Sequence, residues 1–306
     1  MTALDTTVVA TAPALSRPRF SGALVRACRP EQWVKNALVL TAPLAAGAIF
    51  DSHIALRAAL VFVAFSCAAS AGYLVNDLLD VETDRSHPRK RFRPIAAGEV
   101  SQRTAWFMAI ALAFGALGLA AASGRQMLTV VVGIYLLVTI TYSAGIKGLP
   151  YVEVTVVSFG FLLRAVGGAI GTGVPPSEWF LAVCTFGALT VALGKRLAEF
   201  IRVAATNETG RSVLHAYQRD WLAGLRTASA AAMVLAYVGW ALSSPMHDSR
   251  ALALLSALPL TAALVVYLIR NDSGGGEAPE QLFMHDRLLG ACGAVWLGFF
   301  IAAVQL

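Results

Sequence analysis

Apolar residues gather in long blocks along this chain, and short polar segments separate them. A helix that crosses a bilayer needs about 20 apolar residues. Nine blocks approach that length, at residues 37–50, 54–76, 104–122, 127–143, 152–172, 179–194, 222–243, 251–269 and 288–305. The first block is too short to span a bilayer alone, and it reaches the required length only if Trp33 to Asn36 are added at its start. The pattern predicts an all-α polytopic membrane protein with about nine transmembrane helices.

Composition supports this class. Of the 306 residues, 57% are hydrophobic and 14% are charged, whereas soluble domains carry about 25% charged residues. Four dispersed cysteines lack metal-binding spacing, so we expect small buried residues instead of disulfides. Residues 1–20 lack the basic start and apolar core of a signal peptide. We expect them to form a disordered cytoplasmic tail before a single transmembrane domain, residues 21–306.

The basic residues predict an orientation. With a cytoplasmic N-terminus and nine alternating helices, most of the 24 basic residues fall on the cytoplasmic side. The opposite side holds only Arg57, Arg125 and Arg250. Cytoplasmic loops are enriched in Lys and Arg, so we expect the N-terminus and the active site on the cytoplasmic face of the plasma membrane. The net charge of +6 then reflects topology and phosphate binding, and we expect no nucleic-acid partner.

A polar cluster follows the second apolar block, with Asn76, Asp77, Asp80 and Asp84 at spacings that place them on one helix face. A solvated helix end is the usual setting for isolated acids. These acids begin inside an apolar span, where like charges on one face are costly unless a cation lies among them. Carboxylate oxygens suit Mg²⁺, which shares its coordination shell with substrate phosphates. The cluster predicts a magnesium-bound diphosphate.

Other charged residues near the membrane are candidates for phosphate binding. A basic loop follows the acids and serves topology, but its arginines also suit phosphate oxygens. Two further groups fall at cytoplasmic helix ends. For the second of these, which contains Lys195, Arg196 and Glu199, a salt bridge within the helix is the alternative to phosphate binding. Arg164, inside a span, needs a partner or a phosphate. The candidates are Lys90, Arg91 and Arg93 in the loop, Tyr142, Lys147 and Glu153 in the first group, and Lys195, Arg196 and Glu199 in the second.

Several of these motifs resemble the UbiA superfamily of intramembrane prenyltransferases. They are Asn76-Asp77-x-x-Asp80-x-x-x-Asp84, Arg93-Pro94 with Gly98, and Tyr142-Ser143 with Lys147. The resemblance implies nine helices around a central cavity, and prenyl diphosphates bound through two magnesium-binding aspartate motifs. The second motif departs from the family pattern, because Gly194-Lys195-Arg196-Leu-Ala-Glu199 is basic where the family is acidic.

A branch of that family shows a narrower resemblance, the decaprenyl-phosphate phosphoribosyltransferases. It is carried by Arg29-Pro30-x-Gln32-Trp33-Val34-Lys35-Asn36, by His87-Pro88-x-Lys90-Arg91-Phe92-Arg93-Pro94-Ile95-Ala96-Ala97-Gly98 and by the segment at 194–199. The resemblance implies phosphoribosyl diphosphate and decaprenyl (polyprenyl) phosphate as substrates, with Mg²⁺ as cofactor. It implies 5-phosphoribosyl-phosphodecaprenol and diphosphate as products, early in synthesis of the arabinose donor for cell-wall arabinan.

The resemblance also suggests roles for single residues. We expect Asp77, Asp80 and Asp84 to bind magnesium, and Asn76 to join the metal shell or the ribose. The basic candidates, with Tyr142 and Glu199, would form the phosphate-binding region, in which Lys195 and Arg196 hold the phosphate on ribose C5. Gln32, Trp33, Lys35 and Asn36 would line the point where the lipid phosphate enters. An aromatic or quinone prenyltransferase, and a membrane transporter, remain alternatives, and a homo-oligomer is open.

Overall fold

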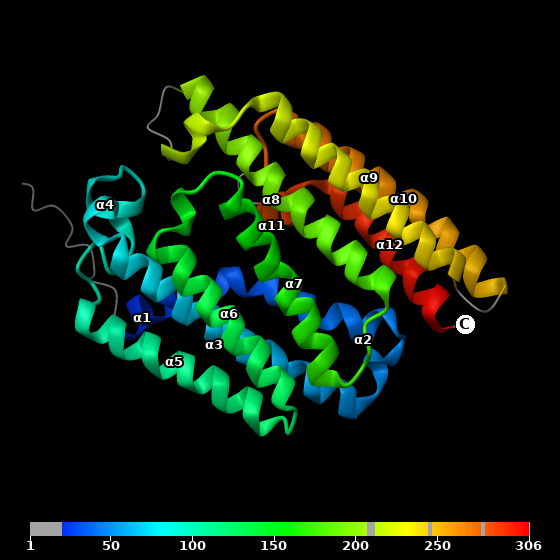
Figure 1. The fold of residues 1–306 in the computed structure, drawn as a ribbon, viewed down its shortest axis with the longest axis horizontal. Coiled ribbons are helices and arrows are strands. Elements are labelled where there is room, and N and C mark those ends of the chain that lie inside the picture. Colours follow the sequence, from blue (N-terminus) through cyan, green and yellow to red (C-terminus); the bar gives the residue numbers. More distant parts are fainter. Residues whose placement is uncertain (1–19, 207–211, 244–246, 277–278, 306) are drawn as a thin grey trace, which may run out of the picture.

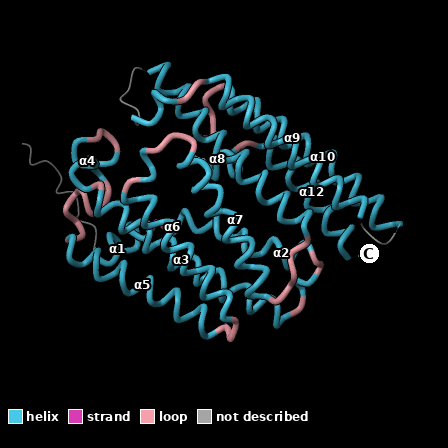
Figure 2. Tube along the Cα trace, viewed as in Figure 1, coloured by secondary structure: helices cyan, strands magenta, loops and turns pink. Residues whose placement is uncertain are grey.

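The computed structural model describes residues 20–206, 212–243, 247–276 and 279–305. In these ranges the regular secondary structure is helical, and Figure 2 shows helices joined by loops without a strand. The predicted tail, residues 1–20, lies outside the described residues except for its last residue.

Eight described helices are long and apolar enough to cross a membrane, which makes the chain a multi-pass membrane protein. Each matches one of the predicted blocks, and most boundaries agree within a few residues. The main difference is α8, which continues about three turns beyond its apolar block. The helices are α3 (Ser52–Leu79), α5 (Gln102–Ala122), α6 (Gln126–Ala144), α7 (Val152–Thr172), α8 (Glu178–Thr206), α9 (Arg219–Ser243), α10 (His247–Asp272) and α12 (Arg287–Gln305).

The first apolar block differs from the expectation of a single spanning helix. It forms a 3₁₀ helix, η1 (Pro30–Leu40), then α2 (Thr41–Ala45) and η2 (Ala48–Phe50). Pro43 lacks the N–H that a continuing helix needs, and Gly47, with a φ of 65°, separates α2 from η2. Runs of 3₁₀ helix longer than three or four residues are uncommon and often mark functional segments. The block therefore contributes a broken helical segment.

The helices form two groups with α7 between them (Figure 1). On one side α3 packs against α5 and α6, and on the other α8 packs against α9, and α10 against α12. The segment η1 packs against both α3 and α7. Shorter elements complete the fold, namely α1 (Phe20–Cys28), α4 (Val81–Ser86), η3 (Lys90–Phe92), η4 (Ile146–Gly148), η5 (Ser212–Ala216) and α11 (Pro279–His285).

Glycine permits the close approach of η1 to α7. A Cβ atom at Gly168 would lie 2.6 Å from the carbonyl carbon of Val39 in η1. Ordinary contacts of this kind begin at 3.4 Å, so no larger residue fits without a shift of the backbone. Small residues at helix interfaces allow such approaches within membranes. This contact fixes the height of η1 along α7.

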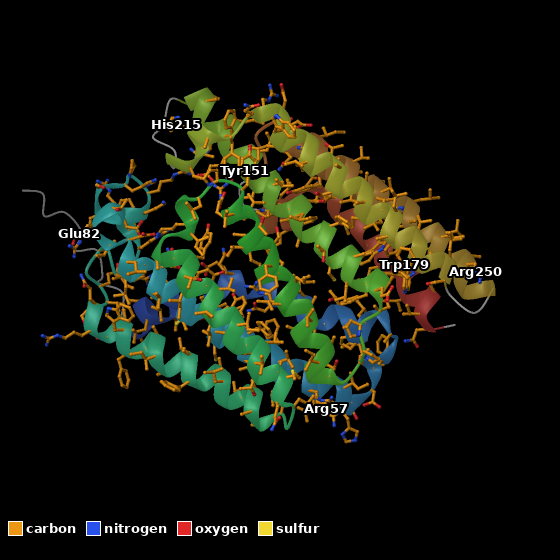
Figure 3. All side chains as sticks on the ribbon, in the orientation of Figure 1. Arg57, Glu82, Tyr151, Trp179, His215 and Arg250 are labelled. Carbon is orange, nitrogen blue, oxygen red and sulfur yellow. The ribbon has the colours of Figure 1, made fainter. Side chains whose placement is uncertain are left out.

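The two ends of the bundle are distinct in Figure 3. Glu82, Tyr151 and His215 are labelled at one end, and Arg57, Trp179 and Arg250 at the other. We call the first the site end, because α4, η3, η4 and η5 lie there together with the predicted acidic cluster.

Candidate active site

The acidic cluster lies where α3 ends and α4 begins. Helix α3 stops at Leu79, and Asp80 is the residue between the two helices, with φ −97° and ψ 5°. The expectation of one continuous helix through Asp84 was therefore wrong. The chain nevertheless stays close to helical, since the Asp84 N–H donates to the Asp80 carbonyl at 2.8 Å.

Asp77 is 2% exposed and lies between two arginines. Arg29 Nη2 lies 2.6 Å from Asp77 Oδ1 and 2.8 Å from Oδ2. Arg93 Nη1 lies 3.2 Å from the same Oδ1. The Asn76 amide nitrogen approaches Oδ1 at 3.5 Å. A carboxylate buried to this degree needs such partners, because an unpaired buried charge is strongly unfavourable.

Asp84 is brought to Asp77 by a shared partner. Arg93 Nη1 donates to Asp84 Oδ2 at 2.6 Å and also contacts Asp77. Burial raises the pKa of the Asp84 carboxyl, and the Arg93 guanidinium opposes that rise. The structure thus brings together Asp77, Asp84 and Arg93, three of the predicted site residues.

Asp80 faces a different cation. Its carboxylate is paired with Lys147 of η4, and both side chains are 28% exposed. This pair joins the end of α3 to the segment between α6 and α7. Asp80 and Lys147 are 67 residues apart along the chain. Two of the predicted basic residues therefore contact the predicted acids directly, Arg93 and Lys147.

The three aspartates could provide carboxylate ligands for Mg²⁺. Within the ranges that the structure describes, no three His, Cys, Asp or Glu side chains gather closely enough to hold one ion together. Mg²⁺ usually takes only one or two carboxylates and fills its shell with water and substrate phosphates. The carboxylate oxygens of Asp77, Asp80 and Asp84 suit a Mg²⁺ ion that takes only part of its coordination shell from the protein and the rest from the substrate.

A second buried cluster lies at the site end of α7 and α8. Glu153 is fully buried, and Arg196 Nη2 lies 2.5 Å from its Oε2. Tyr217 donates to Glu153 Oε1 at 3.0 Å, and the Tyr142 hydroxyl lies 3.4 Å from Oε2. Burial raises the pKa of Tyr217 to about 12, so this hydroxyl keeps its proton near neutral pH. Arg196 also pairs with Glu199, as the in-helix alternative predicted.

This second cluster changes the interpretation of two predicted phosphate ligands, Arg196 and Glu199. Arg196 is 4% exposed, and both of its terminal nitrogens bind carboxylates. Glu199 and Glu153 partner that arginine, and their charges would repel a phosphate. The three side chains hold α7 and α8 together, so a structural role replaces the expected contact of Arg196 and Glu199 with a phosphate.

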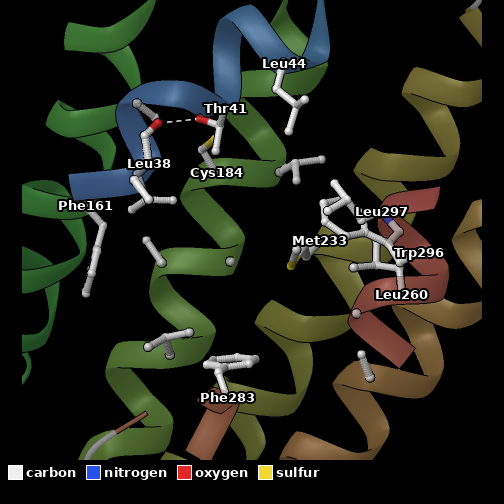
Figure 4. Close-up of a pocket in the computed structure, with 18 of the residues that line it drawn as sticks. Leu38, Thr41, Leu44, Phe161, Cys184, Met233, Leu260, Phe283, Trp296 and Leu297 are labelled. Carbon is white, nitrogen blue, oxygen red and sulfur yellow. Dashed lines mark hydrogen bonds between the residues drawn. The ribbon is translucent and has the colours of Figure 1, made fainter. Parts of the chain in front are cut away.

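Between the second helix group and the wall formed by η1, α2 and α7 lies a cavity of about 720 Å³, lined almost entirely by apolar side chains (Figure 4). From α8 it receives Phe180, Val183, Cys184, Gly187, Ala188 and Val191. These positions form one face of the helix. At about 1.5 Å per residue they extend for about 17 Å. Lys195 follows Val191 by four residues and continues this face at the site end.

The opposite wall of the cavity comes from η1. In a 3₁₀ helix side chains three residues apart are eclipsed, so Gln32, Lys35 and Leu38 form a straight row, and Thr41, the first residue of α2, follows it. Lys35, Leu38 and Thr41 line the cavity, and Lys35 Nζ contacts Gln32 Oε1. The row is polar at the site end and apolar further along.

The remaining predicted residues of η1 form its buried side. Trp33 Nε1 donates to Ser70 Oγ at 3.0 Å. Asn36 is fully buried, and its amide nitrogen lies 3.0 Å from Ser66 Oγ. The expectation that Asn36 lines the point of lipid entrance was therefore wrong, because its side chain faces α3 and α7.

Arg164 has the protein partners that the sequence left open. Its Nε donates to Asn36 Oδ1 at 2.8 Å, and its Nη2 lies 2.6 Å from the Tyr135 hydroxyl. The guanidinium also lies over the Tyr135 ring, 4.7 Å from its centroid. It is 6% exposed, so the network joins η1, α6 and α7 inside the bundle and leaves no phosphate role to Arg164.

The basic loop lies beside the acids. Arg91 is exposed, with its guanidinium 4.8 Å from the Phe92 ring centroid, and Lys90 is half-buried. Sequence reasoning gave no role to Arg29 or Tyr217. Arg29 stood inside a quoted motif, but its charge was already explained by membrane orientation. Tyr217 lies in a polar loop without a recognisable pattern.

Comparisons with known proteins agree with this fold. The model of the UbiA prenyltransferase family matches residues 37–302. The decaprenyl-phosphate phosphoribosyltransferase of Corynebacterium glutamicum is 40% identical over 288 residues, covering 92% of this chain and 87% of that protein. The Mycobacterium tuberculosis protein of the same name is 40% identical over 289 residues, covering 92% and 94%.

Solved structures show the same architecture. A UbiA homolog from Archaeoglobus fulgidus, bound to GPP and Mg²⁺, aligns with a TM-score of 0.67 at 19% identity and covers 93% of this chain and 100% of that one. At that identity the likeness concerns the fold. The family model spans most of the sequence and the relatives align over nearly their full length, so this chain belongs to the UbiA prenyltransferase family.

Proposed function

We propose that this chain transfers the 5-phosphoribosyl group of phosphoribosyl diphosphate to decaprenyl (polyprenyl) phosphate. The products would be 5-phosphoribosyl-phosphodecaprenol and diphosphate, in the synthesis of the decaprenyl arabinose donor for cell-wall arabinan. One observation carries the proposal: a set of paired acids and bases, Asp77, Asp80 and Asp84 with Arg93 and Lys147, lies at the site end of the bundle, and Lys35 of η1 lines an apolar cavity. The 40% identity to two phosphoribosyltransferases supports it.

The donor diphosphate would lie at the acidic cluster. Mg²⁺ would supply charge stabilisation on the diphosphate oxygens as the leaving group departs. Asp77, Asp80 and Asp84 would supply its carboxylate ligands, one or two to each ion, with Asn76 beside them. Arg93 and Lys147, together with Lys90 and Arg91 of the basic loop, would contact phosphate oxygens.

The acceptor lipid would place its chain in the cavity and its phosphate near Lys35. Counted along η1 at about 2.0 Å per residue, Lys35 lies about 12 Å beyond Arg29, which contacts Asp77. The interval between them leaves room for the ribose. Lys195, which continues the cavity face of α8, would contact the C5 phosphate. An acidic residue there would repel that phosphate.

The reaction needs no strong base, because a lipid phosphate monoester is ionised near neutral pH. Its oxygen would attack C1 of the ribose as the bond from C1 to the diphosphate oxygen breaks. Direct displacement inverts C1, so an α-configured donor gives a β-linked lipid. An α-linked product would contradict this mechanism. The distribution of basic residues supports a cytoplasmic site and N-terminus in the plasma membrane.

One assay tests the proposal. Purified protein receives radiolabelled phosphoribosyl diphosphate and polyprenyl phosphate, with Mg²⁺ or with a chelator. We expect labelled lipid only with the metal. Absence of labelled lipid, together with activity on a prenyl diphosphate and a phenol, would identify an aromatic prenyltransferase instead. Inactivity in both assays, with transport of a solute into proteoliposomes, would identify a transporter.

A further inference from the structure

We propose that Arg29 competes with the divalent metal for Asp77 and then binds the donor diphosphate, so that metal and donor bind together. The inference rests on the proposed function and assigns a residue that it does not use. Arg29 ends the turn between α1 and η1 and lies 48 residues from Asp77 along the chain. The pair is therefore a tertiary contact that folding brings about.

The contact occupies much of the Asp77 carboxylate. One carboxylate offers about four lone-pair sites on its two oxygens. Arg29 Nη2 lies within 2.8 Å of both oxygens, Arg93 takes a further contact at Oδ1, and the Asn76 amide nitrogen approaches Oδ1 at 3.5 Å, so the contacts number four. Asp77 is 2% exposed, so water reaches it poorly. A metal that coordinates Asp77 must therefore displace a guanidinium, and Arg29 is the closer of the two.

The backbone of Arg29 is in an unusual conformation that favours this contact. Its φ is 53° and its ψ 61°, in the left-handed region that residues other than glycine seldom adopt. Pro30 follows and disfavours the right-handed helical region at Arg29. Such outliers persist where the surrounding structure fixes them, often at functional sites. The guanidinium also lies 5.2 Å from the Tyr73 ring centroid, which holds it beside the carboxylate.

The competition has a consequence for binding order. While Arg29 contacts Asp77, a free divalent ion gains little from that carboxylate. A metal that arrives with the diphosphate gives Arg29 a new anionic partner, so the two ligands strengthen each other. Coupling between two ligands is reciprocal, hence the donor should raise metal affinity by the same factor as the metal raises donor affinity.

Mn²⁺ binding to the full chain in nanodiscs without acceptor lipid tests this. The probes are Mn²⁺ alone, followed by EPR, and Mn²⁺ with phosphoribosyl diphosphate, which stays intact because no acceptor is present. Arg29→Asn removes the guanidinium and suits the left-handed backbone. We expect this variant to bind Mn²⁺ alone about tenfold tighter than the parent, the scale of a lost charge-assisted contact. We expect its donor affinity at saturating Mg²⁺ to fall by about tenfold or more.

Arg26→Gln is the matched control. Arg26 lies one turn earlier on α1, is half-exposed and pairs with Glu99 outside the acidic cluster. This substitution removes the same charge three residues earlier in the chain, so both affinities should stay within about twofold of the parent, as for a surface pair. Arg29→Lys, which keeps the charge with a smaller contact, should fall between the parent and Arg29→Asn. It replaces Arg29→Asn if that variant elutes as aggregate.

The outcomes separate the two proposals. Mn²⁺ affinity that is unchanged or weaker when Arg29 is replaced would overturn the competition, whether or not the donor binds. Equal tightening in the Arg26 control would overturn it too, because general charge would then be the cause. A parent protein that binds no phosphoribosyl diphosphate would overturn the proposed function and the coupling, while the comparison with Mn²⁺ alone still decides competition at Asp77.

Discussion

Replacing Gly168 by alanine should reduce activity far more than stability. Gly168 lies where η1 crosses α7, and an added Cβ would lie 2.6 Å from the Val39 carbonyl carbon and closer still to its oxygen. Ordinary contact begins at 3.4 Å, so the two backbones must separate by about 0.8 Å or more, the difference of the two distances. Neither neighbour is a flexible side chain that could turn away.

The energetic and catalytic effects differ in size. Overpacking of this kind costs about 1–3 kcal/mol, and alanine recovers up to about 1 kcal/mol through its better helix propensity. The net loss of stability should be about 2 kcal/mol or less. The displacement, however, moves η1, which carries Lys35 and directly follows Arg29, the two residues proposed above to contact the substrates. A misplacement of about 1 Å can lower a rate about a hundredfold.

Thermal unfolding in nanodiscs and the labelled-lipid assay measure the two effects on one preparation. Gly118→Ala is the matched control, because Gly118 lies in the middle of α5 and an added Cβ there meets no atom within 4 Å. It should keep full activity and gain up to about 1 kcal/mol. A Gly168→Ala protein with the parent's rate and stability would refute the close approach of η1 to α7.

Three further predictions concern single side chains. Asp80→Asn should abolish transfer, whereas exposed Glu82→Gln on α4 should not, and near-normal turnover of the first would refute the metal role. Arg196→Leu leaves the buried Glu153 without its paired guanidinium and should destabilise the protein by about 3–5 kcal/mol, which thermal unfolding would reveal; an unchanged unfolding temperature would contradict the structural role. In steady-state kinetics Lys195→Gln should raise KM for phosphoribosyl diphosphate and Lys35→Gln KM for the lipid; the reverse pattern would exchange the two assignments.

The sequence predicted the spanning helices well, because apolar length is the main requirement for crossing a bilayer. It failed at the first block, where an apolar run cannot distinguish a 3₁₀ segment from an α-helix. It also placed the end of α8 too early. Lys195 and Arg196 read as a boundary, yet the helix continues to Thr206, since carboxylates on α7 and α8 pair with Arg196.

The acidic cluster was also partly predictable. The spacing of Asp77 and Asp84 indicated a common side, and the structure joins them through Arg93. The partners of the acids could not be read from spacing, since Lys147 lies 67 residues from Asp80. Arg29 is a similar case, because only the turn before η1 brings it to Asp77. Local periodicity carries no information about such tertiary pairs.

The row of side chains on η1 offers a physical reason for a sugar donor in a fold that elsewhere serves prenyl chains. It begins next to Arg29 with Gln32 and Lys35 and becomes apolar at Leu38, which lines the cavity. A prenyl diphosphate at the acidic cluster would have to lay its apolar chain along the polar part of this row. A phosphoribosyl group instead offers hydroxyls there, and the chain that fills the cavity then belongs to the acceptor. The preference for a sugar donor over a prenyl donor would then depend on the point at which η1 changes from polar to apolar. Arg196, which is held by two glutamates, would contribute little to this preference.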